Sequence, residues 1–437
     1  MRVSIPSGAK ARVHFAAFAA VRVKTLTYQS CPFKTSTYAK VPELGIFAII
    51  NTMRTVLTAD RLWDGHGLLH RPMVVIEDGC IASISSRANG ELPGEARVLD
   101  FPGATLGPAF FDVHIHGAKG HDVMEATAEA LCAMGGFLAQ HGTGSFLATT
   151  VTAPLDATLR SLSGLAKLLA QPAVAGQARP IGIHLEGPFL SHAKRGVQPP
   201  EHLLAPNIAT FDRLFDAAEG RIRLMTLAPE LPGAAELTAH AISRGVRISM
   251  GHSDATAAET RAVIAAGAIS ATHTFNAMRP LDHREPGILG TVLTEDELYA
   301  EMICDGIHTA PEMVKLWWRA KGPERAILVT DAMSATGMPD GEYQLGGFAV
   351  QVANGRAMAR GVLAGSVLTL DRALTNFMAF TGAPLELALR LLTVNPALMT
   401  GLGDQAGSVA VGMPANLVAV DEAGKLVGSV VNGEPVS

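Results

Sequence analysis

The segment Ile181-Gly-Ile-His-Leu-Glu-Gly-Pro-Phe-Leu190 shows most clearly what kind of structure this chain forms. Apolar residues lead into His184 and Glu186, and Gly187-Pro188 then ends the run, which is the pattern of a buried strand in a parallel sheet. The two polar residues lie two positions apart, so they point to the same face of a strand. Because a single carboxylate at a strand end is more often a hydrogen-bond acceptor than a metal ligand, the assignment of Glu186 depends on the rest of the chain.

Composition narrows the class of protein. With 437 residues, 48% of them hydrophobic, and a mean hydropathy of +0.25, the chain can bury one large core and a smaller accessory core. A net charge of -5 and a pI near 6.3 argue against a nucleic-acid partner. No apolar run reaches the roughly 18 residues that span a membrane, and no CxxC pair suggests a cysteine zinc site. We therefore expect a cytoplasmic protein that binds neither nucleic acid nor membrane.

The first 53 residues differ from those that follow. They contain seven Lys or Arg, one acidic residue, Glu43, and no sustained periodicity. Met53 directly precedes Arg54, where a segment with the character of a folded domain begins. We expect residues 1–53 to form a poorly ordered N-terminal extension.

Two β-rich pieces flank a different middle part. Residues 54–107 carry short β-like runs broken by turns, and residues 401–437 have the same character. Residues 108–400 alternate helix-like stretches with eight apolar runs, near 109–115, 143–151, 180–185, 222–228, 246–251, 268–272, 298–304 and 326–330. This alternation favours an α/β fold of the (β/α)8 TIM-barrel type over a doubly wound sheet. The two end pieces are expected to combine into one small β-sandwich domain.

Histidine and carboxylate side chains follow these runs, at the strand ends where a barrel places its active site. His114 and His116 form an HxH pair on one strand face, which can grip a metal with two ligands. His252 and His273, on consecutive strands, can converge with Glu186 into a set that leaves one position open for water. Nitrogen and oxygen ligands without a thiolate favour zinc, with iron, manganese and cobalt as alternatives.

Two further residues suggest chemistry beside a metal. Asp331 ends the last run and is expected across the barrel mouth from the metal, where a carboxylate can take a proton from water and pass it to a leaving group. Arg284, in a loop that follows Asn276-Ala277, is either a surface ion-pair partner or part of an anion clamp. The sequence has no Walker A or GxGxxG loop, which argues against a nucleotide cofactor.

The motifs together reveal a family resemblance. They are, in order, FDVHIHG (111–117), HLEGPFL (184–190), GHSDA (251–255), THTFNAM (272–278), HREPG (283–287), DGIH (305–308), LVTDAM (328–333) and LAGS (363–366). From about residue 54 to its C-terminus, the chain resembles the N-acetylglucosamine-6-phosphate deacetylases of the amidohydrolase superfamily. The combination is specific to that family, whereas an HxH pair or a TDA triplet alone is shared by all amidohydrolases.

The resemblance implies a role for each matched residue. The implied metal ligands are Glu186, His252 and His273 for the main ion, and His114 and His116 for a second. Asp331 is the implied general acid and base. The implied substrate contacts are Val197, Gln198, Asn276, Ala277, Arg284, Asp305, His308, Ala364, Gly365 and Ser366. In this family the arginine of HREPG reaches the site of a neighbouring subunit, so a homodimer, or a tetramer, is expected.

One position departs from the family pattern. Where the family usually has Lys-x-Gly-Ala-His, this chain has Lys194-Arg-Gly-Val-Gln198, so an amide replaces an imidazole. An amide still donates a hydrogen bond but cannot become cationic. We expect Gln198 to help polarise the acetyl carbonyl, with an altered strength or an altered preference for the acyl sugar.

The expected reaction is hydrolysis of N-acetyl-D-glucosamine 6-phosphate to D-glucosamine 6-phosphate and acetate, in amino-sugar catabolism or recycling. The alternatives are N-acetylgalactosamine 6-phosphate as substrate or another amidohydrolase specificity, such as a cyclic amide. Cyclic-amide hydrolases usually bridge their metals with a carboxylated lysine rather than a glutamate, and a clamp at Arg284 favours a phosphorylated substrate. A non-catalytic assembly protein would be expected to have lost the metal ligands, which this chain retains.

Overall fold

A parallel sheet of eight strands forms the centre of the molecule in the computed structural model, which describes residues 54–87 and 96–436. Its strands are β6 (Phe110–Ile115), β9 (Thr143–Thr149), β10 (Arg179–Glu186), β11 (Ile222–Leu227), β12 (Arg247–Met250), β13 (Ser270–Ala271), β14 (Tyr299–Ile303) and β15 (Ala326–Val329). They pair in this order, each parallel to the next. Each strand coincides with one predicted run, so the predicted barrel is confirmed. The extension expected at residues 1–53 lies outside the described residues.

The sheet curls until its two edge strands meet. Ile115, the last residue of β6, forms a parallel bridge with Ala332, just beyond β15, and the N–H of Asp331 donates to the carbonyl oxygen of His114 at 2.9 Å. Strands β6, β9 and β15 are buried at every residue, as expected for a parallel sheet that is covered by helices. The closure brings the first and last strands together at their carboxyl ends, where the predicted functional residues follow.

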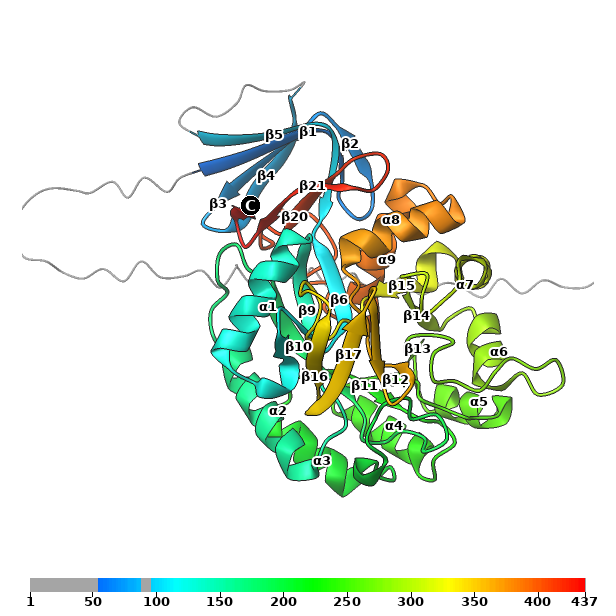
Figure 1. The fold of residues 1–437 in the computed structure, drawn as a ribbon. Helices are drawn as coiled ribbons and strands as arrows, with labels where there is room; N and C mark the ends of the chain where they lie inside the picture. The colour runs from blue at the N-terminus through cyan, green and yellow to red at the C-terminus, as the bar shows by residue number, and fades with distance from the viewer. Residues whose placement is uncertain (1–53, 88–95, 437) are drawn as a thin grey trace, which may run out of the picture.

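Helices cover the outer surface of the barrel (Figure 1). They are α1 (Ala128–Gln140), α2 (Leu155–Leu169), α3 (Ile208–Ala217), α4 (Ala234–Ser243), α5 (Ala257–Ala265), α6 (Gly287–Thr294), α7 (Pro311–Arg325), α8 (Leu370–Thr381), α9 (Leu385–Leu392) and α10 (Val394–Thr400). Local sequence fixes some of their starts. Helix α5, for example, begins with a capping box in which Thr256 and Glu259 each accept the other's backbone N–H.

A second sheet of eight strands is built from both ends of the described chain. Its strands are β1 (Arg54–Trp63), β2 (Leu68–His70), β3 (Pro72–Glu77), β4 (Cys80–Ser86), β5 (Ala96–Pro108), β20 (Leu417–Val420), β21 (Leu426–Val431) and β22 (Glu434–Val436). Strands β5 and β20 pair antiparallel, with Leu106 opposite Ala419, and this pairing joins the two parts. Figure 1 shows the blue and red strands together above the barrel, which confirms the predicted two-ended β-domain.

A four-stranded antiparallel sheet follows β15 and was not predicted. It comprises β16 (Gly341–Leu345), β17 (Phe348–Ala353), β18 (Arg356–Ala359) and β19 (Val362–Leu363). Its buried side chains, such as Val350 and Val352, pack with Val151 and Met333 from the loops beyond β9 and β15. The small sheet therefore covers part of the mouth of the barrel, and β17 lies in front of the barrel strands in Figure 1.

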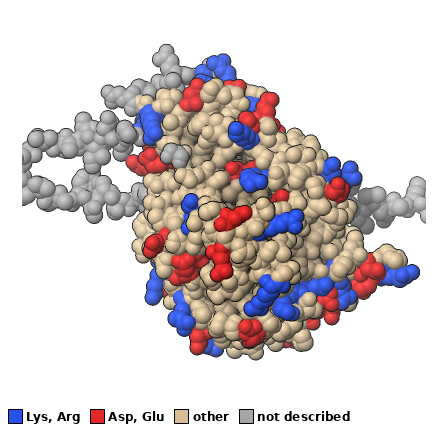
Figure 2. Space-filling view, in the orientation of Figure 1, with Lys and Arg blue, Asp and Glu red and all other residues tan. Residues whose placement is uncertain are grey.

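The described residues contain no candidate membrane span, and one face of the molecule carries charges of both signs. No helix in the described ranges is both long enough and apolar enough to cross a bilayer. On the face shown in Figure 2, acidic side chains are interspersed with lysines and arginines instead of leaving a single basic patch.

Candidate metal centre and active site

Six buried side chains converge at the carboxyl ends of the barrel strands. They form two groups in which the ligand atoms lie within 4.8 Å of one another: Glu186, His252 and His273, and then His114, His116 and Asp331. The Oε1 atom of Glu186 lies 3.3 Å from Nε2 of His114, of His252 and of His273, so this carboxylate lies between the two groups. The structure thus brings together all the metal ligands predicted from the sequence.

Three of the four imidazoles are held by a hydrogen-bond acceptor at the other ring nitrogen. At 3.0 to 3.2 Å from Nδ1, His114 has the carboxylate of Glu301, His116 the carbonyl oxygen of Thr149, and His252 the carbonyl oxygen of Lys194. Because these partners accept hydrogen bonds, each Nδ1 carries a proton and each Nε2 can present a lone pair to the centre.

This donor set fits a metal ion. The Nε2 atoms of His252 and His273 are 3.1 Å apart, and the buried Oε1 of Glu186 receives no hydrogen bond from the described residues. Lone pairs that face one another at this distance repel unless a cation lies among them. Ligand atoms bound about 2.0–2.1 Å from a tetrahedral zinc ion would themselves be about 3.3 Å apart. The spacing therefore suits a divalent ion.

The electrostatics of the cluster lead to the same conclusion. Burial alone would raise the pKa of Glu186, but the surrounding imidazoles, His114 foremost, hold this pKa well below its ordinary value. Burial also opposes ionisation of Asp331, yet His114 and His116 lower its pKa to about 2. For His114, burial would lower the pKa, but Glu186 and Asp331 raise it well above its ordinary value. Two ionised carboxylates thus attract positive charge, which protons supply in the metal-free chain and a divalent ion would supply in their place.

Asp331 lies within this cluster. Its Oδ1 is 3.1 Å from Nε2 of His116 and 3.5 Å from Nε2 of His114. Closure of the sheet carries Asp331 to the HxH pair and not to the far side of the mouth. Its φ of 50°, with 45° at His252 and 27° at His273, is in the left-handed region that non-glycine residues rarely adopt. Such backbone strain persists chiefly at functional sites, so it supports a functional role for these turns.

A cavity of about 330 Å³ opens onto the cluster. This volume is within the usual range for a small-molecule site. Besides five of the six clustered side chains, its lining includes six of the substrate contacts predicted from the sequence: Val197, Gln198, Asn276, Ala277, His308 and Gly365. The structure therefore assembles the metal cluster and most of the predicted substrate contacts around one space.

Both ends of the Gln198 amide have partners. Its Nε2 donates to Oε2 of Glu186 at 2.8 Å, and its Oε1 accepts the N–H of Thr152 at 2.9 Å. Because a backbone N–H can only donate, the oxygen must face Thr152 and the NH2 group must face Glu186. Gln198 therefore orients a candidate metal ligand, which the sequence did not suggest, and one amide hydrogen remains for the cavity.

Asp305 reaches the cavity only through His308. Its carboxylate lies 2.7 Å from Nδ1 of His308 and accepts the backbone N–H groups of Ile307 and His308. Burial would raise the pKa of Asp305, but the His308 contacts lower it below its ordinary value. The ionised Asp305 thus keeps the proton on Nδ1 of His308 and leaves Nε2 free to contact a ligand.

The LAGS segment supports Asp331 more than it lines the cavity. Gly365 lines the space, but Ala364 and Ser366 do not. The N–H of Ser366 donates to the carbonyl oxygen of Asp331 at 2.7 Å. Gly365 has a φ of +62°, and a Cβ there would lie 3.0 Å from the same carbonyl oxygen. A glycine is therefore required where this segment passes Asp331.

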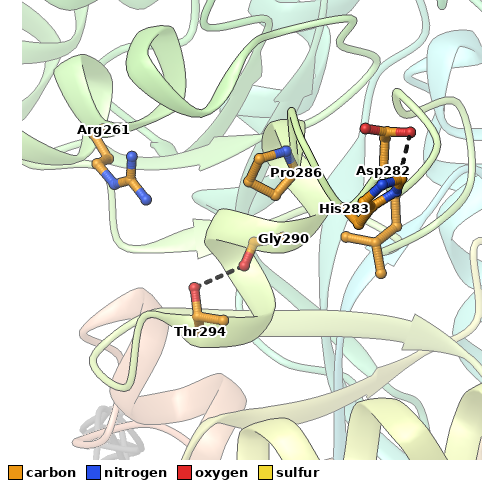
Figure 3. A pocket seen from close by; sticks show the side chains of 7 residues that line it. Arg261, Asp282, His283, Pro286, Gly290 and Thr294 are labelled. Atoms are coloured by element: carbon orange, nitrogen blue, oxygen red, sulfur yellow. Dashed lines mark hydrogen bonds and ion pairs between the residues drawn. The ribbon is translucent and has the colours of Figure 1, made fainter.

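Arg284 lies outside the cavity, on an exposed loop before α6. The carboxylate of Asp282 holds the loop by accepting the N–H groups of Arg284 and Glu285 at 2.8 and 3.2 Å. Beside the loop is a separate groove of about 680 Å³, lined by Arg261, Leu281, Asp282, His283, Pro286, Gly290 and Thr294. In the view of Figure 3, Arg261 lies on one side of Pro286, with Asp282 and His283 on the other. None of these residues belongs to a candidate metal group of the described chain, so this groove is not the candidate active site.

His184, prominent in the sequence, supports the cluster without joining it. Its Nε2 is 2.8 Å from the hydroxyl of Thr226, its Nδ1 is 3.1 Å from the carbonyl oxygen of Val113, and its ring meets that of His114 edge-on at 4.7 Å. Burial, assisted by the charge of His114, holds the pKa of His184 well below its ordinary value. His184 is therefore a neutral packing partner.

The sequence predictions omitted three features of the site. Glu301 is fully buried in β14, and a charged residue within an apolar run was the available signal for it. Lys194 lines the cavity and holds His252, and its place in the Lys194–Gln198 segment could have identified it. The small sheet contributes Leu345, Val362 and Leu363 to the wall, for which the sequence carries no clear signal.

Comparison with known proteins adds independent support. Residues 105–436 match the Amidohydrolase family. The chain is 38% identical over 370 residues to N-acetylgalactosamine-6-phosphate deacetylase from Escherichia coli O157:H7, which covers 84% of this chain and 96% of that protein. It is 37% identical over 363 residues to N-acetylglucosamine-6-phosphate deacetylase from Bacillus subtilis (strain 168), with 82% and 91% covered.

Among solved structures, the chain is similar to a mutant N-acetyl-D-glucosamine-6-phosphate deacetylase from Mycobacterium smegmatis in complex with N-acetyl-D-glucosamine-6-phosphate. The TM-score is 0.81 at 36% identity, with 88% of this chain and 99% of that chain covered. The family match at residues 105–436 includes all eight barrel strands and the six clustered side chains. The chain belongs to the amidohydrolase family and, within it, to the N-acetylglucosamine-6-phosphate deacetylases.

Proposed function

We propose that this protein hydrolyses the amide of N-acetyl-D-glucosamine 6-phosphate to acetate and D-glucosamine 6-phosphate, in amino-sugar catabolism or recycling. The observation that carries the proposal is the convergence of Glu186, His252, His273 and Asp331 at one cavity. Relatives at 37% and 38% identity that are named for this class of reaction support it.

The chemistry needs a divalent ion, most simply zinc, which when bound would activate water and polarise the acetyl carbonyl. Glu186, His252 and His273 would hold this ion, and His114 with His116 would offer a second position. Asp331 would take a proton from the attacking water and deliver it to the amide nitrogen as the C–N bond breaks. The free N–H of Gln198 would donate to the acetyl oxygen as negative charge develops there.

The phosphate needs positive charge at the other end of the cavity, because a phosphate monoester carries about -1.5 to -2 charges at pH 7. Within the described cavity lining, Lys194 is the one Lys or Arg, and His308 and the Asn276-Ala277 backbone provide further donors. We propose a homodimer in which Arg284 of a second copy completes this end, since the Arg284 of the same chain is exposed on its loop. Because a sugar phosphate does not cross membranes unaided, we place the reaction in the cytoplasm.

Subunit complementation tests the shared site. Arg284→Ala and Asp331→Asn chains, each weakly active alone, are mixed under conditions that exchange subunits. If Arg284 acts across the dimer, half of the dimers are mixed and each has one intact site, so activity should recover to about one quarter of the wild-type level. If activity does not recover although subunits exchange, Arg284 acts only within its own subunit or takes no part in the reaction.

Substrate comparison tests the proposed function itself. N-acetyl-D-galactosamine 6-phosphate is the second candidate, favoured by the 38% identity to the enzyme named for it. We expect acetate release from at least one 6-phosphorylated N-acetylhexosamine, and a kcat/KM at least about 100-fold lower for unphosphorylated N-acetylglucosamine, because the phosphate contacts are lost. Equal kcat/KM values with and without the phosphate would contradict the assignment of a phosphorylated substrate.

A further inference from the structure

We propose that Glu301 is a positioning residue that controls occupancy of the second metal position, formed by His114, His116 and Asp331. This inference rests on the proposed binding of two ions but does not depend on which acyl sugar is the substrate. Glu301 is none of the six candidate ligands, and no motif in the sequence marked it.

Glu301 is a fully buried carboxylate, and burying a charge is costly unless it is paired. It lies in β14 with 0% exposure, between the apolar neighbours Ala300 and Met302. Its Oε2 accepts hydrogen bonds from Nδ1 of His114 at 3.2 Å and from the backbone N–H of His273 at 3.3 Å. Its Oε1 has no hydrogen-bond partner among the described residues. A buried carboxylate that is only partly satisfied is costly, which argues that it serves the histidines it contacts.

Glu301 gives His114 a charged hydrogen-bond acceptor, whereas His116 and His252 have neutral acceptors. Nδ1 of His116 and Nδ1 of His252 are held by neutral peptide carbonyls, whereas Nδ1 of His114 is held by this carboxylate. A carboxylate behind an imidazole fixes the ring and makes the opposite nitrogen a stronger electron donor. His114 is therefore the histidine best prepared to bind a metal through Nε2.

Glu301 contacts one histidine from each candidate metal group, but it contacts them through different atoms. It touches His114 through the ring that would bind an ion, but touches His273 only through the backbone. The main group keeps Glu186, His252 and the His273 ring without it. Loss of the Glu301 charge should thus weaken the second position much more than the first.

Metal titration of metal-free protein tests this directly. Zn²⁺ is titrated into the full chain and its Glu301→Gln variant, with bound metal counted per chain and the ligand field of Co²⁺-loaded samples followed by visible absorption. We expect two equivalents in the wild type. In the variant, the affinity for the second equivalent should fall about 10–100-fold, with the first changed less than about 3-fold.

Two further variants make the result specific. Asp371→Asn is the matched control, since its carboxylate also accepts from a histidine, Nδ1 of His141 at 3.1 Å, but outside the site, and its metal binding should equal the wild type. In a His114→Ala background, which removes the supported ligand, Glu301→Gln should cause no additional loss. If Glu301→Gln does not fold, Glu301→Asp replaces it. This variant keeps the charge but is one methylene shorter, so it should lose the contact with Nδ1 of His114, and it is judged by the same criteria.

Several outcomes would overturn the inference. They are an unchanged second equivalent in Glu301→Gln, an equal loss of both equivalents, an additional loss in the His114→Ala background, or a wild type that binds one ion. None of these would by itself contradict the deacetylase assignment, because acetate release can be measured on the same samples. Conversely, an inactive protein that shows the expected metal pattern would refute the proposed reaction and leave the role of Glu301 intact.

Discussion

The side-chain amide of Gln198 donates to the carboxylate of Glu186 at 2.8 Å, so the residue that departs from the family pattern holds the carboxylate between the two histidine groups. The substitution of an amide for an imidazole is therefore linked to the metal centre as well as to the substrate. A glutamine suits this position because its oxygen accepts the N–H of Thr152 while its nitrogen donates to Glu186.

The first prediction concerns Gln198→Ala. We expect turnover to fall about 10²–10³-fold, because a donor to the acetyl oxygen is lost. We also expect metal affinity to fall about 10-fold or more, because Glu186 loses the group that orients it. Steady-state kinetics and metal titration on the same samples measure both. Gln198→His restores the usual family residue and is the matched control. Wild-type turnover in Gln198→Ala would remove this residue from the mechanism, and lost turnover with unchanged metal affinity would limit it to substrate contact.

The second prediction concerns Asp331→Asn. The asparagine keeps the shape of the side chain but cannot carry a proton between water and the leaving nitrogen, so turnover should fall about 10²–10⁴-fold. The first equivalent of metal should remain, because Glu186, His252 and His273 are unchanged. Turnover within about 10-fold of the wild type, in protein of known metal content, would rule out this proton transfer.

The third prediction concerns metal removal. Because the cluster places ionised carboxylates among imidazoles, an ion bound to the folded chain should stabilise it, by about 2.7 kcal/mol at a free concentration of 100 times Kd. A chelator should therefore lower the Tm and added Zn²⁺ should restore it. Glu186→Gln, which removes the charge between the two groups, should abolish most of this response. A wild-type Tm that is independent of both chelator and zinc would mean that the cluster does not bind the ion.

The fourth prediction uses a pair far from the cluster. Burial would raise the pKa of Asp371, but its contact with Nδ1 of His141 lowers this pKa below its ordinary value. Because the folded pKa is lower than the unfolded one, the stabilisation is present above about pH 4 and is lost as the pH falls through the folded pKa. Asp371→Asn should therefore cost about 0.5–1 kcal/mol of unfolding free energy at pH 7 and progressively less below pH 4. Urea denaturation across this range measures it, and a cost that is constant with pH would refute the electrostatic explanation.

The barrel was predictable because its buried strands appear in the sequence as runs of apolar residues. A strand such as β15, Ala326–Val329, is buried at every residue and appears in the sequence as a continuous apolar run. The small sheet β16–β19 was not predictable in the same way. In β17 the buried Val350 and Val352 alternate with exposed residues, which is a weak sequence signal. The position of the sheet over the barrel mouth depends on packing against Val151, which lies in a distant loop.

The site was predictable where function and strand ends coincide. His252 and His273 follow consecutive strands, and their convergence with Glu186 follows from barrel geometry alone. The contact of Asp331 with the HxH pair required the closure between β6 and β15, and the hydrogen bond from Gln198 to Glu186 required the path of a loop. That one oxygen of Glu301 has no hydrogen-bond partner in the described part of the chain depends on packing, which no residue pattern reports.

The most direct test of the central claim is acetate release from N-acetyl-D-glucosamine 6-phosphate, measured as Zn²⁺ is added back to metal-free protein. We predict no release without metal, an increase in proportion to the first equivalent bound, and no recovery in Glu186→Gln at any metal content tested. Release that is independent of bound metal, or no release from either 6-phosphorylated N-acetylhexosamine by fully loaded protein, would contradict the account.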